Sequence, residues 1–304
     1  MKIAYGILCH TDPNHIGRLA KKLTKNVNSK VFVHVDKKVD ITPFENQLLD
    51  KKNVYVLSNR VEINWGGYQA IEATINLMQT AKNIFKFDRF VLLQGLEYPI
   101  KSGKEIEDFF VKNFDTEFLL AQNISTIDNL EEQHKYRLYY KFGSSSIFWK
   151  IINKTNCFLV KKRIVPHLKK NYIRDKQGKK MWIYQGCAQF GITYLAVEYI
   201  LNFNATNPKF NSYFKTMFAP DEAYFHTIIY NSYFINNTPE KSANYKQHLT
   251  DFANLTYFEY PNQIRVFKSK EEWEILKSSG KLFFRKACSE SKELLDYIDS
   301  VHDE

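Results

Sequence analysis

The chain has 304 residues, of which 44% are hydrophobic and 15% aromatic, enough for one large packed domain or two small ones. Its net charge of +10 excludes basic partners and favours anionic ones, such as a nucleotide, a nucleic acid or lipid headgroups. The four cysteines form no C-x-x-C pair, which argues against a structural zinc site.

The amino terminus, Met1–Leu8, is apolar but short, and His10 and Asp12 interrupt the apolar run at once. A signal peptide or a membrane span needs a longer apolar stretch, so this segment predicts a first strand. We therefore expect a cytoplasmic protein with reduced thiols.

Strands and helices alternate through the first 121 residues. The sequence predicts strands at Ile3–Leu8, Val31–Val35, Val54–Leu57, Phe90–Leu93 and Glu117–Ala121, and helices at Ile16–Leu23, Tyr68–Ala81 and from Ile106 to Phe110. The continuous apolar run at Phe90–Leu93 is typical of a parallel strand covered on both faces. This alternation predicts an α/β fold with a mainly parallel sheet, helices on both faces and a ligand at the carboxyl ends of the strands.

The rest of the chain begins with a less regular segment, residues 122–185, which we interpret as an insertion that shapes an acceptor cleft. Beyond it, the sequence predicts strands at Cys187–Thr193 and Leu255–Tyr260, and helices at Tyr194–Phe203, Pro220–Asn231 and Lys270–Ser278. No repeat or long linker interrupts the chain. We expect a single domain over residues 1–304, with a nucleotide-binding half at 1–121 and an acceptor-binding and catalytic half at 122–304.

Basic residues gather within the insertion at Lys161-Lys162-Arg163, Lys169-Lys170 and Lys179-Lys180, with aromatic residues between them. Such a distribution is compatible with a patch for an anionic membrane surface. A nucleic-acid stripe or an ordinary solvated face would give the same pattern.

Two adjacent acids, Asp221 and Glu222, lie in the first turn of the helix predicted at Pro220–Asn231. Pro220 fits the first helical position, where a missing N–H costs nothing. The apolar residues that follow would bury one face of the helix, so Glu222 would sit just outside the core, where a general base for a substrate hydroxyl could act. An acidic first turn that complements the helix dipole is the alternative interpretation.

Seven segments occur in an order that spans most of the chain: Ile3–His10, Val31–Lys37, Asn64–Gly67, Leu92–Ser102, Gln185–Phe190, Pro220–Glu222 and Leu282–Lys286. Together they resemble the core-2/I-branching β-1,6-N-acetylglucosaminyltransferases and the related protein xylosyltransferases, family 14 of the glycosyltransferases, as a bacterial-type member. The resemblance implies a GT-A-type, Rossmann-like fold and transfer from a UDP-sugar with inversion at the anomeric carbon. It also implies that no divalent metal and no other cofactor takes part, because basic side chains neutralise the leaving UDP in this family.

The resemblance implies roles for individual residues. Glu222 matches the family's general base, and Arg285 and Lys286 match its basic pair at the diphosphate. The remaining candidates are Arg265, Asp36, His10, Trp65 and Gly66 for the UDP-sugar, and Asp221, Glu97, Gly186, Arg137, Tyr257 and Glu259 for the acceptor. Glu97 departs from the Asp usual in the family. Cys187 takes the place of a Ser and is not expected to be a nucleophile, since an inverting transfer needs no covalent intermediate.

The sequence therefore predicts an inverting, metal-independent glycosyltransferase. It would move a sugar, with N-acetylglucosamine as the leading candidate, to a hydroxyl of a glycan acceptor in surface polysaccharide or oligosaccharide synthesis. A lipid-linked acceptor and peripheral contact with the inner face of the plasma membrane would suit the basic clusters. Xylosyl transfer and a metal-dependent GT-A transferase that uses Asp36 or Glu97 are the enzyme alternatives. A non-catalytic protein that binds nucleic acid or an anionic glycan is the third, and we expect no nucleic-acid partner.

Overall fold

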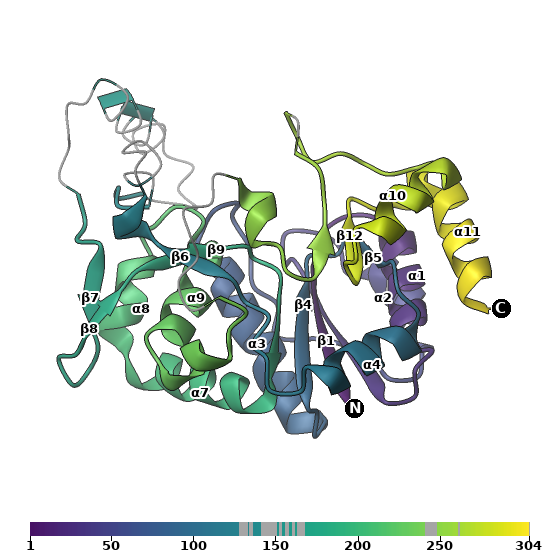
Figure 1. The fold of residues 1–304 in the computed structure, drawn as a ribbon, viewed down its shortest axis with the longest axis horizontal. Coiled ribbons are helices and arrows are strands. Elements are labelled where there is room, and N and C mark those ends of the chain that lie inside the picture. The colour runs from purple at the N-terminus through teal and green to yellow at the C-terminus, as the bar shows by residue number, and fades with distance from the viewer. Residues whose placement is uncertain are drawn as a thin grey trace.

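A five-stranded sheet forms the centre of the computed structural model, which describes residues 1–127, 133, 136–140, 151, 154, 155, 158, 159, 162, 168–240, 248–260 and 262–303 (Figure 1). Its strand order is β10-β4-β1-β2-β3. The strands span Ile3–Cys9 (β1), Ser29–Val35 (β2), Val54–Val56 (β3), Arg89–Leu93 (β4) and Phe190–Thr193 (β10). The first four are parallel, and β10 pairs antiparallel with β4. The mainly parallel α/β sheet that the sequence predicts is thus confirmed, and it draws on both halves of the chain.

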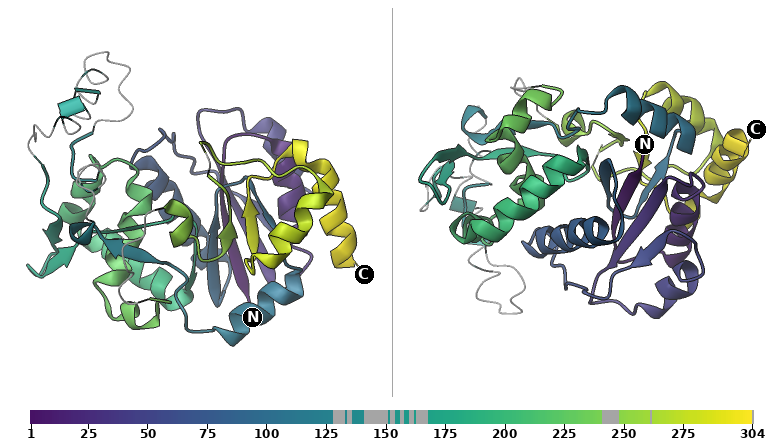
Figure 2. Two further views of the ribbon diagram at one scale, coloured as in Figure 1. Left: turned by 45° about the horizontal axis from the view of Figure 1, so that its top comes forward. Right: turned by 90° about the horizontal axis from the view of Figure 1, so that it is seen from below.

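Helices cover both faces of this sheet (Figure 2). Because successive strand residues point to opposite faces, Ala4 of β1 joins one core while Ile3 and Tyr5 join the other. The first core is completed by α3 (Gln69–Ile84), α7 (Tyr194–Thr206), α8 (Pro208–Phe214) and α9 (Tyr224–Tyr230). The second is completed by α1 (Pro13–Leu23), α2 (Thr42–Leu48), α4 (Gly103–Lys112), α10 (Trp273–Ser278) and α11 (Lys292–Asp303). Burial on both faces explains why β1 and β4 are almost wholly apolar.

Smaller sheets flank the central one. The chain leaves β4 through a turn at Gly95, whose φ of +77° favours glycine. It then enters a three-stranded sheet in the order β11-β12-β5. These strands span Thr256–Tyr257 (β11), Phe283–Arg285 (β12) and Glu97–Pro99 (β5). Two further pairs join β6 (Ala121–Asn123) to β9 (Tyr184–Gly186), and β7 (Tyr172–Arg174) to β8 (Lys180–Trp182).

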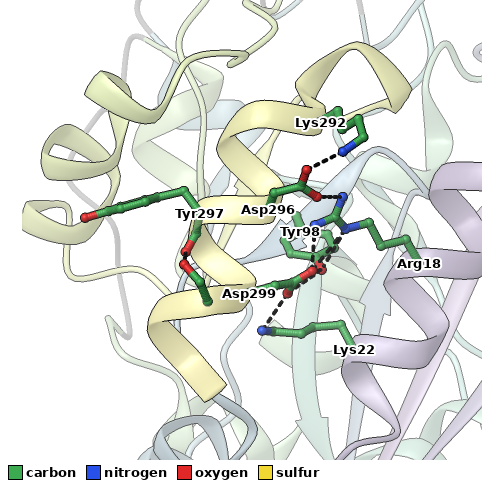
Figure 3. Close-up of polar contacts among 8 residues, drawn as sticks. Arg18, Lys22, Tyr98, Lys292, Asp296, Tyr297 and Asp299 are labelled. Atoms are coloured by element: carbon green, nitrogen blue, oxygen red, sulfur yellow. Dashed lines mark hydrogen bonds and ion pairs between the residues drawn. The ribbon is translucent and has the colours of Figure 1, made fainter. Parts of the chain in front are cut away.

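The carboxyl-terminal helix α11 is fixed to the first helix by ion pairs (Figure 3). Asp299 forms ion pairs with Arg18 and Lys22, each at 2.7 Å, and Asp296 forms one with Arg18 at 2.8 Å. The hydroxyl of Tyr98, a buried residue of β5, also donates to Asp299 at 2.8 Å. These charge-assisted hydrogen bonds attach α11 to both α1 and β5.

Several predicted elements differ from the observed ones. The strand predicted at Glu117–Ala121 was wrong, because β6 begins at Ala121 and Phe118 makes a single bridge with Gly191. The strands predicted at Cys187–Thr193 and Leu255–Tyr260 are shorter than expected, as given above. The elements α2, α8, α11, β5 and β12 were not predicted from the sequence. The short strands among these are held by pairing with distant segments, which no local pattern records.

No helix in the described ranges is long and apolar enough to cross a bilayer. Cys9, Cys187 and Cys288 are free thiols, and Cys157 lies outside the described residues.

Candidate active site

A cavity of about 360 Å³ lies where β1, β2 and β4 end. His10 directly follows β1, and Asp36 directly follows β2, so the parallel sheet brings both to the same edge. The predicted site residues that line the cavity are His10, Asp36, Trp65, Gly66, Asp221 and Arg285. The cavity therefore gathers residues from distant parts of the chain at the place where α/β sheets bind ligands.

Backbone hydrogen bonds fix the loop that carries Asp36. Its Oδ1 accepts from the N–H of Lys38 at 2.9 Å and of Ile63 at 3.3 Å. The guanidinium of Arg60 donates to the carbonyl oxygens of Val35 at 3.0 Å and of Asp36 at 2.7 Å. One carboxylate oxygen of Asp36 is therefore engaged by the loop, and the other is left to face the cavity and the Lys38 ammonium, 3.8 Å away.

Trp65 lies at the rim of the cavity with 84% of its surface exposed. Its ring meets the ring of Phe218 edge-on, with the centroids 5.3 Å apart. The next residue, Gly66, has a φ of +74°, and its carbonyl oxygen accepts from the N–H of Ala219 at 3.0 Å. These contacts join the Trp65 loop to the chain immediately before the two adjacent acids.

The acids lie on a 3₁₀ turn, Pro220–Glu222, and the α-helix α9 begins only at Tyr224. The prediction of one continuous helix over Pro220–Asn231 was therefore wrong. Ala219 adopts the left-handed conformation, and Ala223, with φ −130° and ψ −33°, separates the turn from the helix. The turn closes through the N–H of Ala223, which donates to the carbonyl oxygen of Pro220 at 3.1 Å.

The two acids have different surroundings. Burial raises the pKa of Asp221 to about 6, so this cavity-lining carboxyl titrates close to neutrality. The hydroxyl of Tyr136 donates to Oε2 of Glu222 at 3.4 Å. Glu222 is half-buried and is not among the residues that line the cavity, although its neighbour Asp221 is, so its role as the base stays a prediction.

Arg285 brings positive charge to the cavity. It is the last residue of β12 and lies opposite Glu97 of β5 in the antiparallel register. Its Nη1 donates to Oε1 of Glu97 at 2.7 Å, and Glu97 is fully buried. The carboxylate also accepts from the Gln94 N–H at 2.7 Å and from the Gln189 amide at 3.0 Å. A direct contact between Glu97 and an acceptor, as the sequence analysis expected, does not fit this placement.

A family model described as the Core-2/I-Branching enzyme matches residues 3–275. The chain belongs to the Core-2/I-Branching enzyme family. Xylosyltransferase 2 from Canis lupus familiaris and the same protein from Homo sapiens are each 24% identical to it over 240 residues, which is 76% of this chain and 25% of each relative. Xylosyltransferase 2 from Bos taurus is 27% identical over 151 residues, or 47% of this chain and 17% of the relative. The chain thus spans about a quarter of the length of the first two.

Three other candidates of this Core-2/I-Branching family member form a cluster of their own. Arg265 pairs with Glu259 at 2.7 Å and also with Glu272, and the Tyr257 hydroxyl donates to Glu259 at 2.8 Å. None of the three is among the residues that line the cavity. Lys286 is not among them either, although it follows Arg285 and its N–H donates to the carbonyl oxygen of Arg265 at 3.0 Å. The substrate roles of these four residues stay predictions.

Arg137 and Gly186 have structural explanations. Arg137 donates to the carbonyl oxygen of Lys169 at 2.8 Å and to the Gln133 side chain at 3.1 Å. A Cβ at Gly186 would lie 2.1 Å from the carbonyl oxygen of Leu120 and 2.6 Å from the ring of His226. Only glycine fits there, and this packing needs no acceptor.

Gln189 was not predicted as a site residue, although it lies in one of the segments that resemble the family. Its amide joins Glu97 to Cys187, whose Sγ–H donates to the Gln189 side-chain oxygen at 2.7 Å. Burial raises the pKa of the Cys187 thiol to about 12, so the group stays protonated at neutral pH. A protonated, hydrogen-bonded thiol suits the expectation that Cys187 is no nucleophile.

The basic clusters of this family member do not all lie in the exposed patch that the sequence suggested. Lys169 is buried against the rings of Tyr139 and Tyr213, and its burial lowers its pKa to about 7, so it cannot belong to an exposed basic patch. Lys161 and Arg163 lie outside the described residues.

Across the part of the chain that the structure describes, no three His, Cys, Asp or Glu side chains converge to hold a metal ion.

Proposed function

We propose that the chain is an inverting glycosyltransferase that moves a sugar from a UDP-sugar to a hydroxyl of a glycan acceptor without a divalent metal. The observation that carries the proposal is the convergence of Arg285 and Asp221, the residue before Glu222, on one cavity at the carboxyl ends of the parallel strands. N-acetylglucosamine is the leading sugar, in keeping with the family. Xylose is the second candidate, because the relatives are named xylosyltransferases.

In the proposed reaction, Glu222 takes the proton of the acceptor hydroxyl as its oxygen attacks the anomeric carbon from the face opposite UDP. The new glycosidic bond forms while the bond to the β-phosphate oxygen breaks, so UDP leaves with the bonding electrons. Arg285 and Lys286 stabilise the charge that grows on that phosphate, more strongly in the transition state than in the ground state. The Tyr136 hydroxyl would keep the Glu222 carboxylate in place.

Other residues of the cavity wall suit the nucleoside. The second carboxylate oxygen of Asp36, which lies 3.8 Å from the Lys38 ammonium, can accept from a ribose hydroxyl or from the uracil N–H. The glycine backbone at Gly66 permits close approach of a ligand, and the exposed ring of Trp65 can pack on it. His10 completes this part of the cavity wall.

The environments of Asp36 and Glu97 support the metal-independent reaction over its metal-dependent alternative. A metal on the diphosphate would need free carboxylate oxygens at the cavity. Asp36 gives one oxygen to backbone amides and has the other beside the Lys38 ammonium, and Glu97 is buried and paired with Arg285. The cation already present, Arg285, can take the charge-neutralising role.

A thermal-shift panel of UDP and UDP-sugars, each with and without excess EDTA, tests the proposal. Stabilisation that is indifferent to EDTA is the expected result, and the UDP-sugar that stabilises most would identify the donor. Stabilisation that EDTA abolishes would favour the metal-dependent alternative. No response to any uridine nucleotide would contradict the proposed function.

Peripheral contact with an anionic membrane is a separate part of the proposal. Lys21, Lys25, Lys51 and Lys52 line a depression together with the exposed Val27, and the exposed Leu49 precedes Lys51 by two residues. These residues lie in or next to the loops that precede β2 and β3, so they are at the opposite end of the sheet from the cavity. Lysines beside protruding apolar side chains fit an anionic bilayer. Failure to sediment with anionic vesicles at low salt would contradict this contact.

A further inference from the structure

Glu97 is a buried carboxylate at a junction of three chain segments. It accepts hydrogen bonds from Gln94 after β4, from Gln189 before β10 and from Arg285 at the end of β12. A buried carboxylate is stable only when its oxygens are satisfied and its charge is paired, and these three donors meet both needs. Of the three, Arg285 is the charged one, and it also lines the cavity.

The strand that carries Glu97 is held from the other side as well. Tyr98, the next residue, points to the opposite face of β5, where its hydroxyl donates to Asp299 (Figure 3). The backbone carbonyl of Glu97 is 3.1 Å from Nε2 of His15. Glu97 therefore has little freedom to move. Its ion pair restricts the position of the Arg285 guanidinium in turn.

Arg285 retains capacity for a ligand. A guanidinium has five N–H donors in a planar fork. Within the described ranges, Glu97 is the one hydrogen-bond partner of the Arg285 side chain, through Nη1. An arginine on a flexible stem would lose rotamer freedom on binding a phosphate, whereas one already fixed by a carboxylate does not.

We propose that Glu97 is a positioning residue that fixes the Arg285 guanidinium so that its remaining N–H groups face the β-phosphate of the bound donor. This inference rests on the proposed function. Gln189 assists by holding the same carboxylate oxygen, and through Cys187 it links this junction to the segment that follows β9. The carboxylate itself touches no substrate.

The Glu97→Gln variant tests this role, because an amide has one acceptor oxygen where three donors now converge. Its dissociation constants for UDP and for uridine should be compared with those of the wild type by calorimetry and ligand-observed NMR. We expect UDP binding to weaken by roughly 10-fold or more, as when one partner of a charged hydrogen bond is removed. Uridine binding should change by less than about 2-fold, because uridine has no phosphate for Arg285.

The two ligands separate positioning from a purely structural role, since a collapsed cavity would lose uridine and UDP alike. Equal losses for both ligands, or unchanged or tighter UDP binding, would overturn the inference. In an Arg285→Ala background, Glu97→Gln should add no further loss of UDP affinity, and an additive loss would also overturn it.

A milder variant covers the case in which Glu97→Gln does not fold. Gln189→Ala leaves the Glu97–Arg285 ion pair but removes one support, and it should weaken UDP binding several-fold at constant uridine binding. The matched control is Glu198→Gln, which removes a surface carboxylate paired with Lys82 and should leave both affinities unchanged. A wild type that binds uridine but not UDP would overturn the inference, and one that binds neither would also contradict the proposed function.

Discussion

Glu97 and Arg285 face each other across the pairing of β5 and β12, and their 2.7 Å ion pair places a buried carboxylate directly behind the cation at the cavity. Arg285 and Asp36 both line this cavity, and the carboxylate of Glu97 fixes the Arg285 guanidinium. A diphosphate between them would have its nucleoside at Asp36 and its leaving oxygen at Arg285.

Removing the basic residues should weaken nucleotide binding. Arg285→Ala and Lys286→Ala should each weaken UDP binding by about 10-fold or more and lower turnover further, because charge-assisted hydrogen bonds to phosphate are lost. Calorimetry with UDP measures the first effect. Lys104→Ala, on an exposed ion pair of α4, is the control and should change neither. A Lys286→Ala variant with normal UDP affinity would remove Lys286 from the diphosphate site.

Asp221 should make donor binding depend on pH. Its raised pKa means that the folded protein keeps this carboxyl protonated up to about pH 6, and above that pH the ionised group repels the diphosphate. The affinity for a UDP-sugar, whose phosphates do not titrate in this range, should fall several-fold between pH 5 and pH 7.5. The Asp221→Asn variant should show no such fall, and a fall that persists in it would exclude Asp221 as the cause.

The raised pKa of Asp221 also makes the free energy of unfolding depend on pH. The pKa of Asp221 in the folded protein is higher than its unfolded value of about 4. The protonated group therefore stabilises the native state fully at pH values below about 4. This contribution is lost as the pH rises through about 6. Asp221→Asn should therefore raise the free energy of unfolding at pH 7, measured with urea, and a lower value would show that the ionised carboxylate stabilises the fold.

Gly186 should be required for folding rather than for chemistry alone. A Cβ there would overlap the carbonyl oxygen of Leu120 and the His226 ring, both held within the core. Gly186→Ala should lower the free energy of unfolding by about 2 kcal/mol or more, as overpacking does. Gly103→Ala, at the start of α4, has no contact under 3.3 Å and serves as the control in the same urea titrations. A stable Gly186→Ala variant that fails to bind acceptor would instead support the acceptor role.

The parts of the fold that follow local patterns could be predicted from the sequence. The apolar run at Phe90–Leu93 became β4 with one residue added, because burial on both faces leaves few alternatives. The strand ends also predicted His10 and Asp36 at the cavity, since parallel strands end at one edge. The separation of the acidic turn from α9 could not be predicted, because it depends on Ala219 adopting a left-handed conformation that is usual only for glycine.

The contacts behind the cavity could not be predicted locally. Glu97 lies 92 positions from Gln189 and 188 positions from Arg285, and β5 and β12 are only three residues long each. No periodicity marks such short strands, which exist because their partners are already in place. The resemblance to the family placed Arg285 at the donor but gave Glu97 an acceptor role that its burial does not fit.

The measurement that tests the central claim most directly is turnover of Glu222→Gln beside its affinity for UDP. The amide keeps the size of the side chain but cannot take a proton from the acceptor hydroxyl. We predict that UDP binding stays within about 2-fold of the wild type while sugar transfer falls by about 10²-fold or more. Near-normal transfer by this variant would contradict the assignment of Glu222 as the base.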